Sequence, residues 1–249
     1  MKRQAIIIAN PGKSGTESYL GGVTKDVENF RSFLLSPNGG LWREDEIIEM
    51  VRPSRTKVLK AIDEIIDCEY AFVAFSGHGW YSSFVDSTIL ELRDGEDIDS
   101  NDLRTVAPKQ TLIIDCCRVV ESAMPSFIMD SARIAKRAAQ INPKSCRKYY
   151  NSRIEECAAG IVVMHSCAIG ETSGDDARKG GYYTSNLLET SKDWARNSTT
   201  DTSENYSILS VDRAHDAAMS LVERYSGRRQ NPYIEKPRTP KQFPFCIVA

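Results

Sequence analysis

The class of structure follows from two stretches of this sequence, Tyr70-Ala71-Phe72-Val73-Ala74-Phe75-Ser76-Gly77-His78-Gly79 and Thr111-Leu112-Ile113-Ile114-Asp115-Cys116-Cys117-Arg118. Each begins as a short apolar run and ends in small and polar residues. Runs that are apolar on both faces are typical of strands in a parallel or mixed sheet that helices cover on each side. The two stretches therefore predict buried strands of an α/β domain.

Similar strands and amphipathic helices alternate along the rest of the chain. Further strands are expected at residues 5–9, 47–51, 160–165 and 243–248, the last of which closes the sheet. Helices are expected at residues 23–34, 54–66, 182–194 and 210–225. Between the two opening stretches, residues 87–95 resemble a small hairpin and residues 98–106 a short helix.

Composition and charge exclude several classes of protein. A chain of 249 residues with 41% hydrophobic and 27% charged residues is expected to fold as a single domain, 1–249. A net charge of −2 gives no broad positive field, so we expect neither nucleic acid nor membrane as a partner. The sequence lacks an apolar run long enough to cross a bilayer, and the seven cysteines show no disulfide framework. Together these features predict a cytoplasmic protein with reduced thiols.

Charge is nevertheless uneven along the chain. A basic insert at about 119–156 separates the second opening stretch from the strand at 160–165, and its residues 131–153 hold seven basic side chains and no acidic one. Those seven are Arg133, Lys136, Arg137, Lys144, Arg147, Lys148 and Arg153. Two interpretations remain open: an exposed linker that the protein itself cleaves, and an amphipathic helix built on Ile134, Ala138 and Ile141.

The side chains that can carry chemistry follow the two buried strands. His78 lies between two glycines, and Cys116 and Cys117 end the neighbouring strand. In parallel sheets, reactive groups collect beyond the carboxyl ends of the strands. Taken singly, a loop histidine and two buried cysteines need no function, but their position at neighbouring strand ends favours a Cys-His pair of nucleophile and base.

With these motifs, the chain resembles caspase-fold cysteine peptidases, closest to the metacaspases and their prokaryotic relatives. Ser76-Gly77-His78-Gly79 is similar to the family's histidine motif, and Asp115-Cys116-Cys117 to its Asp-x-Cys motif, which assigns the nucleophile to Cys117. Three further segments resemble the family, at residues 20–26, 165–171 and 180–184. The chain departs from metacaspases at Arg118-Val119-Val120, where His-Ser-Gly is usual, and at Val23 in place of a cysteine.

The resemblance implies a fold and a set of roles. The fold is a three-layer α/β sandwich with a mostly parallel six-stranded sheet and helices on both faces. His78 and Cys117 form the catalytic dyad, and the backbone N–H groups of Gly79 and Cys117 hold the oxyanion. Asp26, Ser76 and Asp115 match an acidic pocket for Arg or Lys at P1, the substrate residue before the cut bond. Ser166 and Cys167 pair with the substrate backbone as an added strand.

The same resemblance implies protein or peptide substrates, an upstream activator protein or ligand, and a regulated effector role in bacterial defence or stress response. No cofactor is expected, although the acidic residues between 84 and 102 leave calcium open, as in some metacaspases. Caspases cleave after Asp through pocket arginines, and Arg118 is the nearby candidate for that alternative. A catalytically inactive binding or scaffold module is the other alternative.

Two unrelated chemistries are less well supported. Gly12-Lys13-Ser14 follows a strand like a phosphate-binding loop, but the glycine that this motif needs five residues earlier is Ile7. A zinc site composed of His78, Cys116, Cys117, His165 and Cys167 would have adjacent cysteines in place of a Cys-x-x-Cys hook.

Overall fold

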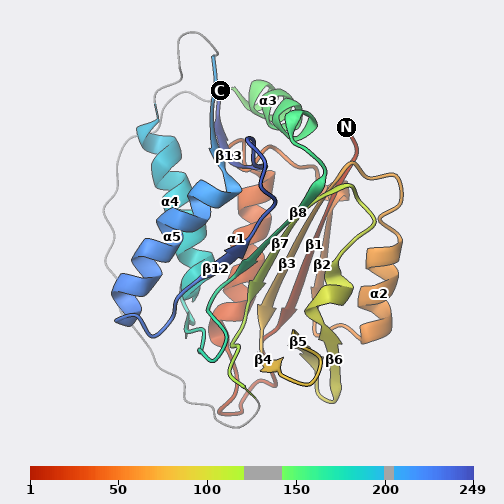
Figure 1. Cartoon of the computed structure of the whole chain (residues 1–249), viewed down its shortest axis with the longest axis vertical. Coiled ribbons are helices and arrows are strands. Elements are labelled where there is room, and N and C mark those ends of the chain that lie inside the picture. The colour runs from red at the N-terminus through yellow and green to blue at the C-terminus, as the bar shows by residue number, and fades with distance from the viewer. Residues whose placement is uncertain (121–141, 199–204) are drawn as a thin grey trace.

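The computed structural model describes residues 1–120, 142–198 and 205–249. Its main sheet has six strands in the order β12-β8-β7-β3-β1-β2 (Figure 1). The strands are β1 (Arg3–Asn10), β2 (Ile47–Val51), β3 (Tyr70–Gly77), β7 (Lys109–Asp115), β8 (Gly160–His165) and β12 (Tyr233–Glu235). All neighbours are parallel except β12, which runs antiparallel to β8. The predicted α/β class with a mostly parallel six-stranded sheet is confirmed.

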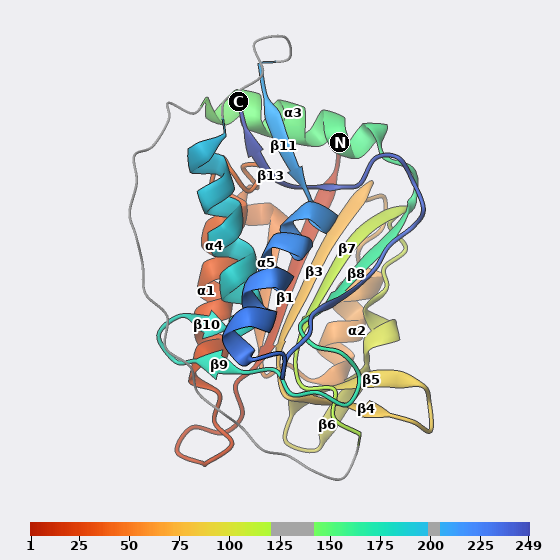
Figure 2. The ribbon, with the colours of Figure 1, turned by 60° about the vertical axis from the view of Figure 1, so that its left-hand side comes forward.

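Helices cover both faces of this sheet, as Figure 2 shows. On one face lie α1 (Gly21–Leu35), α4 (Tyr182–Asn197) and α5 (Val211–Ser226). On the other lie α2 (Arg55–Asp63), a small antiparallel sheet of β4 (Gly79–Ser82), β5 (Ser87–Arg93) and β6 (Glu96–Asp99), and the 3-10 helix η2 (Ser100–Leu103). The remaining elements are η1 (Glu44–Glu46), α3 (Pro143–Glu156), β9 (Asp175–Asp176), β10 (Gly180–Gly181), β11 (Ser207–Ser210) and β13 (Pro244–Val248).

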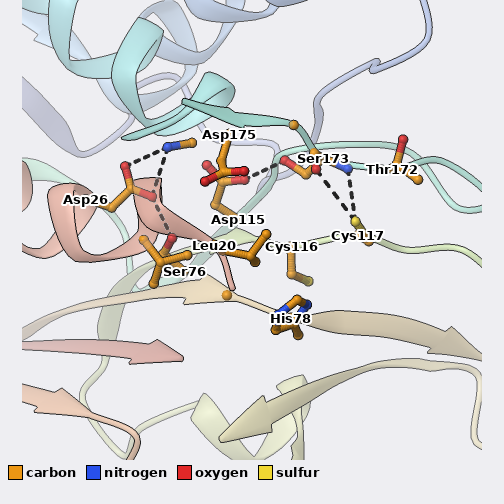
Figure 3. Close-up of a pocket in the computed structure, with 14 residues that line it drawn as sticks. Leu20, Asp26, Ser76, His78, Asp115, Cys116, Cys117, Thr172, Ser173 and Asp175 are labelled. Carbon is orange, nitrogen blue, oxygen red and sulfur yellow. Dashed lines mark hydrogen bonds between the residues drawn. The ribbon is translucent and has the colours of Figure 1, made fainter. Parts of the chain in front are cut away.

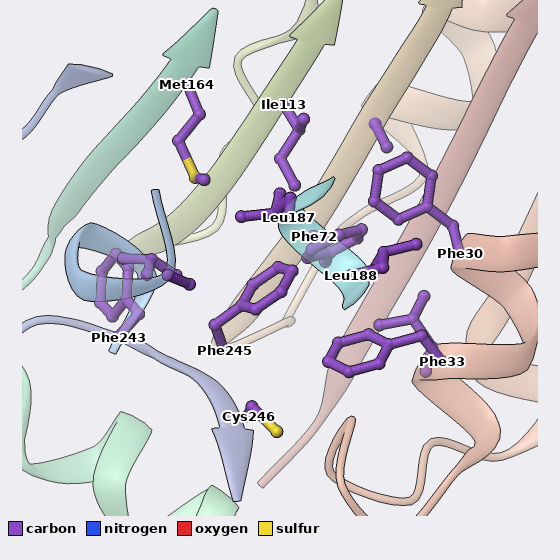
Figure 4. Close-up of a cluster of buried hydrophobic side chains, with 14 of the residues drawn as sticks. Phe30, Phe33, Phe72, Ile113, Met164, Leu187, Leu188, Phe243, Phe245 and Cys246 are labelled. Carbon is purple, nitrogen blue, oxygen red and sulfur yellow. The ribbon is translucent and has the colours of Figure 1, made fainter. Parts of the chain in front are cut away.

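The alternation of side chains along the buried strands builds two cores. Ile7 of β1 belongs to the core beneath α1, α4 and α5, while Ile6 and Ile8 belong to the core beneath α2. In the larger core, Phe33 of α1 stacks on Phe245 of β13 with ring centroids 5.1 Å apart (Figure 4). Because both faces are buried, the strands are fixed in position and can hold the residues at their ends with precision.

Two of the predicted elements are wrong. β13 does not close the main sheet: all five of its residues are buried, and it pairs with β11 in a separate two-stranded sheet. The sixth strand is instead β12, whose three residues are too few to show a strand pattern. Residues 98–106 do not form one helix, because residues up to Asp99 pair with β5 and the Asp99 side chain then caps the single turn of η2.

The described part of the basic insert contains one helix, α3. Helix α3 begins with Pro143, and the Asn142 side chain accepts a hydrogen bond from the backbone of Ser145. Arg147 anchors α3 by an ion pair with the buried carboxylate of Glu46. The helix predicted on Ile134, Ala138 and Ile141 lies outside the described residues.

Candidate active site

The topology brings the predicted catalytic residues together. β3 and β7 are neighbours in register, with Ser76 opposite Asp115, so His78 and Cys117 leave the sheet at the same edge. Both residues line one pocket at this edge (Figure 3). Its lining is Leu20, Val23, Asp26, Ser76, Gly77, His78, Asp115, Cys116, Cys117, Thr172, Ser173, Gly174, Asp175 and Gly181.

A backbone carbonyl, which the sequence does not predict, orients His78. The Nε2 atom of His78 lies 2.7 Å from the carbonyl oxygen of Ser18, in the loop between β1 and α1. Since a carbonyl can only accept a hydrogen bond, this contact places the ring proton on Nε2 and leaves Nδ1 as the basic nitrogen. The ring therefore presents an unprotonated Nδ1, and the described hydrogen bond that orients it comes from a backbone carbonyl.

Cys117 is the more accessible of the two cysteines. Its sulfur accepts a hydrogen bond from the backbone N–H of Ser173 at 3.3 Å, and burial raises the pKa of the thiol while this N–H lowers it. Cys116 is 2% exposed, and burial raises the pKa of its thiol well above the ordinary value. No hydrogen bond joins Cys117 to His78 in the described part of the chain, a spacing that is common before substrate binds.

Three carboxylates line the same pocket. Asp26 is fully buried and accepts hydrogen bonds from the Ser76 hydroxyl at 2.6 Å and from the Gly181 backbone at 2.9 Å. Asp115 accepts hydrogen bonds from the Thr184 hydroxyl at 2.7 Å and from the Ser173 hydroxyl at 2.7 Å.

The third carboxylate, Asp175, was not predicted. Its Oδ2 atom accepts a hydrogen bond from the backbone of Gly22 at 2.8 Å. Its sequence context, Gly174-Asp175-Asp176, is that of an ordinary loop, so the sequence carried no signal for it.

These carboxylates repel one another. Burial and the charge of Asp115 raise the pKa of Asp26 well above its ordinary value, and burial together with the charges of Asp115 and Asp176 raises the pKa of Asp175. Such a cluster is electrostatically unsatisfied, and a cation that entered it would be stabilised by every member.

The backbone of β10 passes close to this acidic cluster. Gly180 has φ +110°, a conformation that L side chains rarely adopt, and a Cβ atom there would collide with the Asp26 carboxylate. At Gly181 a Cβ atom would collide with the Asp115 carboxylate. The Gly180-Gly181 pair thus permits the close approach that lets the Gly181 N–H bind Asp26.

Ser166 and Cys167 lie outside the pocket lining. Both are 0% exposed, and Ser166 bonds through its hydroxyl to the backbone of Cys116. The backbone N–H and carbonyl of Ser166 are occupied by Ile114 and Gln230. Substrate pairing at these residues therefore stays a prediction: in this structure they lie beneath the pocket, and the loop from Thr172 to Asp175 lines it.

Gly79 and Arg118 lie outside the pocket lining. Gly79 begins β4 and packs against Cys116, where a Cβ atom would be 2.7 Å from the sulfur. The Arg118 side chain donates to the Thr88 hydroxyl at 3.0 Å and to the Cys167 carbonyl at 3.3 Å. It lines a separate cavity together with Tyr81, His165 and Glu235.

Neither a metal cluster nor a membrane span is found among residues 1–120, 142–198 and 205–249. No three His, Cys, Asp or Glu side chains in these ranges are grouped so that they could hold a metal ion, and this applies to the cysteines and histidines considered for zinc. No helix in the same ranges combines the length and the apolar character needed to traverse a bilayer.

Comparisons with known proteins identify the fold and the family of the chain. The Caspase domain family matches residues 2–244 of the chain. Among solved structures, the crystal structure of caspase-1 from Spodoptera frugiperda is similar, with a TM-score of 0.57 and 13% identity over 94% of this chain and 86% of that one, which shows a shared fold. No curated protein matches the sequence. Because the family match spans nearly the whole chain, this protein belongs to the caspase family of cysteine peptidases.

Proposed function

We propose that this protein is an endopeptidase that uses Cys117 and His78 to cleave peptide bonds after Arg or Lys. The observation that carries the proposal is the convergence of Asp26, Asp115 and Asp175 on the pocket that also contains the Cys117 sulfur. A guanidinium or ammonium group there would relieve the repulsion among the carboxylates, and it would form charge-assisted hydrogen bonds with them.

The proposed chemistry divides the work between the two residues of the dyad. His78 Nδ1 accepts the Cys117 proton, and the sulfur attacks the carbonyl carbon to form a C–S bond. The backbone N–H groups of Cys117 and Gly79 hold the oxyanion. The imidazolium then protonates the leaving amine as the C–N bond breaks, and water hydrolyses the resulting thioester to regenerate the thiol.

An acidic residue at P1 fits the pocket poorly. His78 is the one basic side chain among the described residues that line it, and the Arg118 guanidinium is engaged with Thr88 and Cys167 elsewhere. A P1 carboxylate would add a further negative charge to the cluster, so charge repulsion selects against it.

Fluorogenic peptides that differ only at P1 test this proposal. We expect cleavage after Arg and Lys, little after citrulline, which is the neutral isostere of Arg, and none after Asp. Cys117→Ala and His78→Ala should abolish turnover, His78→Ala by several orders of magnitude because both the base and the partner of the thiolate are lost. Cys116→Ala is the matched control and should retain most of the activity. No turnover on any peptide, with or without calcium, would indicate a binding or scaffold module instead, and cleavage after Asp would contradict the specificity.

The resemblance to prokaryotic caspase-like proteins supports a wider proposal. We infer a regulated effector of bacterial defence or stress response in the cytoplasm, which cleaves protein substrates after an upstream activator protein or ligand engages it. Induced expression of the wild-type chain and of Cys117→Ala in a bacterial host separates the possibilities. Growth arrest or broad proteolysis with the wild type alone is expected, and identical growth of the two strains under stress would contradict the effector role.

A further inference from the structure

Gln230 reaches the active-site loop from the far end of the chain. Helix α5 is capped at its C-terminus by Gly227, which has a left-handed backbone conformation, and Gln230 follows three residues later. The Gln230 side chain is 0% exposed. Its side-chain amide donates to the Ser166 carbonyl at 2.9 Å and to the Ser173 hydroxyl at 3.1 Å. Its amide oxygen accepts from the Gly174 backbone at 3.1 Å. A buried amide with three such bonds holds the loop in one conformation.

Ser173, which Gln230 contacts, is the residue that touches both halves of the site. Its backbone N–H donates to the Cys117 sulfur at 3.3 Å. Its hydroxyl donates to the Asp115 carboxylate at 2.7 Å. Because a hydroxyl has one proton and that proton is committed to Asp115, the Gln230 amide must be the donor in its contact with Ser173. The direction of every bond in the chain from Gln230 through Ser173 to Asp115 is therefore fixed.

The turn that carries Gln230 is itself anchored. The Ser226 hydroxyl of α5 accepts a hydrogen bond from the Gln230 backbone at 3.1 Å. The next residue, Asn231, donates from its backbone at 2.7 Å and from its side chain at 2.5 Å to the carboxylate of Glu171. The turn after α5 is thus hydrogen-bonded to the loop that follows β8 at two places, Glu171 and Ser173-Gly174.

We propose that Gln230 is a positioning residue of the protease site, which holds Ser173 so that its backbone N–H faces the Cys117 sulfur and its hydroxyl faces the Asp115 carboxylate. This inference rests on the proposed roles of Cys117 as nucleophile and Asp115 as part of the P1 pocket. Gln230 itself does not line the pocket, and it acts through Ser173. The consequence is that one buried amide couples the reactivity of the thiol to the shape of the P1 pocket.

The test compares Gln230→Met with Gln110→Met, which is a closely matched control. Gln110 is also buried, at 2% exposed, and its side chain also makes three hydrogen bonds, to Leu103 and Thr105, but at the opposite end of β7. Alkylation of Cys117 by iodoacetamide is followed residue by residue with mass spectrometry as a function of pH. The KM of an Arg peptide and the Tm are measured on the same samples.

In Gln230→Met we expect the alkylation midpoint of Cys117 to rise by about one pH unit, which is about a tenfold slower reaction at neutral pH, because the thiolate loses the Ser173 N–H. The KM for the Arg peptide should also rise. Gln110→Met should lower the Tm and leave both readouts at the wild-type value. A folded Gln230→Met whose midpoint and KM equal those of Gln110→Met overturns the proposal.

Gln230→Glu keeps the acceptor for the Gly174 N–H and decides the matter if Gln230→Met does not fold. It should show a raised midpoint at Cys117, and an unchanged midpoint overturns the proposal. The failure of the proposed function would look different. If Cys117 of the wild type is alkylated no faster than the buried Cys116, the nucleophile is misassigned. If Arg peptides are not preferred, the P1 pocket is misassigned while the alkylation comparison still stands.

Discussion

Replacing Asp26 with asparagine should move stability and activity in opposite directions. The carboxylate is fully buried, accepts hydrogen bonds from Ser76 and Gly181, and is repelled by Asp115. Asparagine has the same shape: its oxygen can accept the Gly181 N–H, and its amide can donate to the Ser76 hydroxyl. Asp26→Asn therefore removes the charge and keeps the packing.

The size of each effect follows from the environment of the carboxylate. A hydrogen bond to a charged group contributes about 1.5–3 kcal/mol, so losing the charge should lower kcat/KM for an Arg peptide by about 10- to 100-fold. The stability effect has the opposite sign. A carboxyl group whose pKa is raised binds its proton more tightly in the folded state. Its ionisation therefore destabilises the fold by the full amount above the raised pKa, and this penalty shrinks as pH falls from there toward the ordinary pKa of a carboxyl group. The Tm of Asp26→Asn should thus exceed that of the wild type by a margin that grows with pH.

Thermal unfolding from pH 5 to 9 and kinetics on Arg and citrulline peptides measure both effects. Asp193→Asn is a suitable control, because Asp193 is half-exposed on α4 and pairs with Arg196. It should change neither quantity. The loss of kcat/KM in Asp26→Asn should disappear with the neutral citrulline peptide. A lower Tm at every pH, or an equal loss on both peptides, would refute the account of Asp26 as a strained, cation-binding carboxylate.

Three further outcomes are expected. Self-processing should be confined to cleavage after Arg133, Lys136 or Arg137, because the other basic residues of the insert lie in α3, whose backbone is held in a helix. Intact-mass measurement detects the cleavage, and Cys117→Ala is the control. Cleavage at Arg147 or Lys148 would contradict this expectation. Burial lowers the pKa of His215 to about 4, so between about pH 4 and 6.5 the unfolded chain binds more protons than the folded chain. The free energy of unfolding should therefore fall by roughly 3 kcal/mol as pH drops through that range. His215→Gln should show a smaller fall in Tm than the wild type over the same range. Burial raises the pKa of the Cys117 thiol, and the charges of Asp115 and Asp175 raise it further. A bound cation would offset those charges, so butylguanidine should accelerate alkylation of Cys117 at neutral pH while neutral butylurea does not. Equal rates would place the cation elsewhere.

The sequence was sufficient where one residue pattern has one structural solution. Ala5-Ile6-Ile7-Ile8-Ala9 is apolar on both faces and became β1 between two cores. The pattern could not assign β13 to a sheet, because five buried residues look the same whether the partner is β8 or β11. Pairing is decided by what else competes for each edge, and that information is spread over the whole chain.

For the site, the sequence identified residues with side chains of distinctive chemistry and missed those that act through common groups. His78, Cys117, Asp26 and Asp115 lie in recognisable motifs and converge on one pocket. Asp175 has an ordinary loop context, and Ser18 contributes a carbonyl group that every residue has. The sequence does not indicate which backbone donor or acceptor takes part in a site, because almost every residue carries the same groups and only their positions in the fold differ.

The segment after β8 shows the same limit of local sequence pattern. Ser166 and Cys167 directly follow β8, and the family resemblance implies that they pair with the substrate backbone. The chain instead remains beneath the pocket there, because Ser166 bonds to Cys116 and Gln230. It joins the pocket lining at Thr172, after a loop in which the Glu171 carboxylate accepts hydrogen bonds from Asn231. Buried hydrogen bonds between Ser166 and Gln230, some 60 residues further along the chain, therefore help to decide where this segment joins the pocket wall. Local sequence pattern contains no information on such a distant contact.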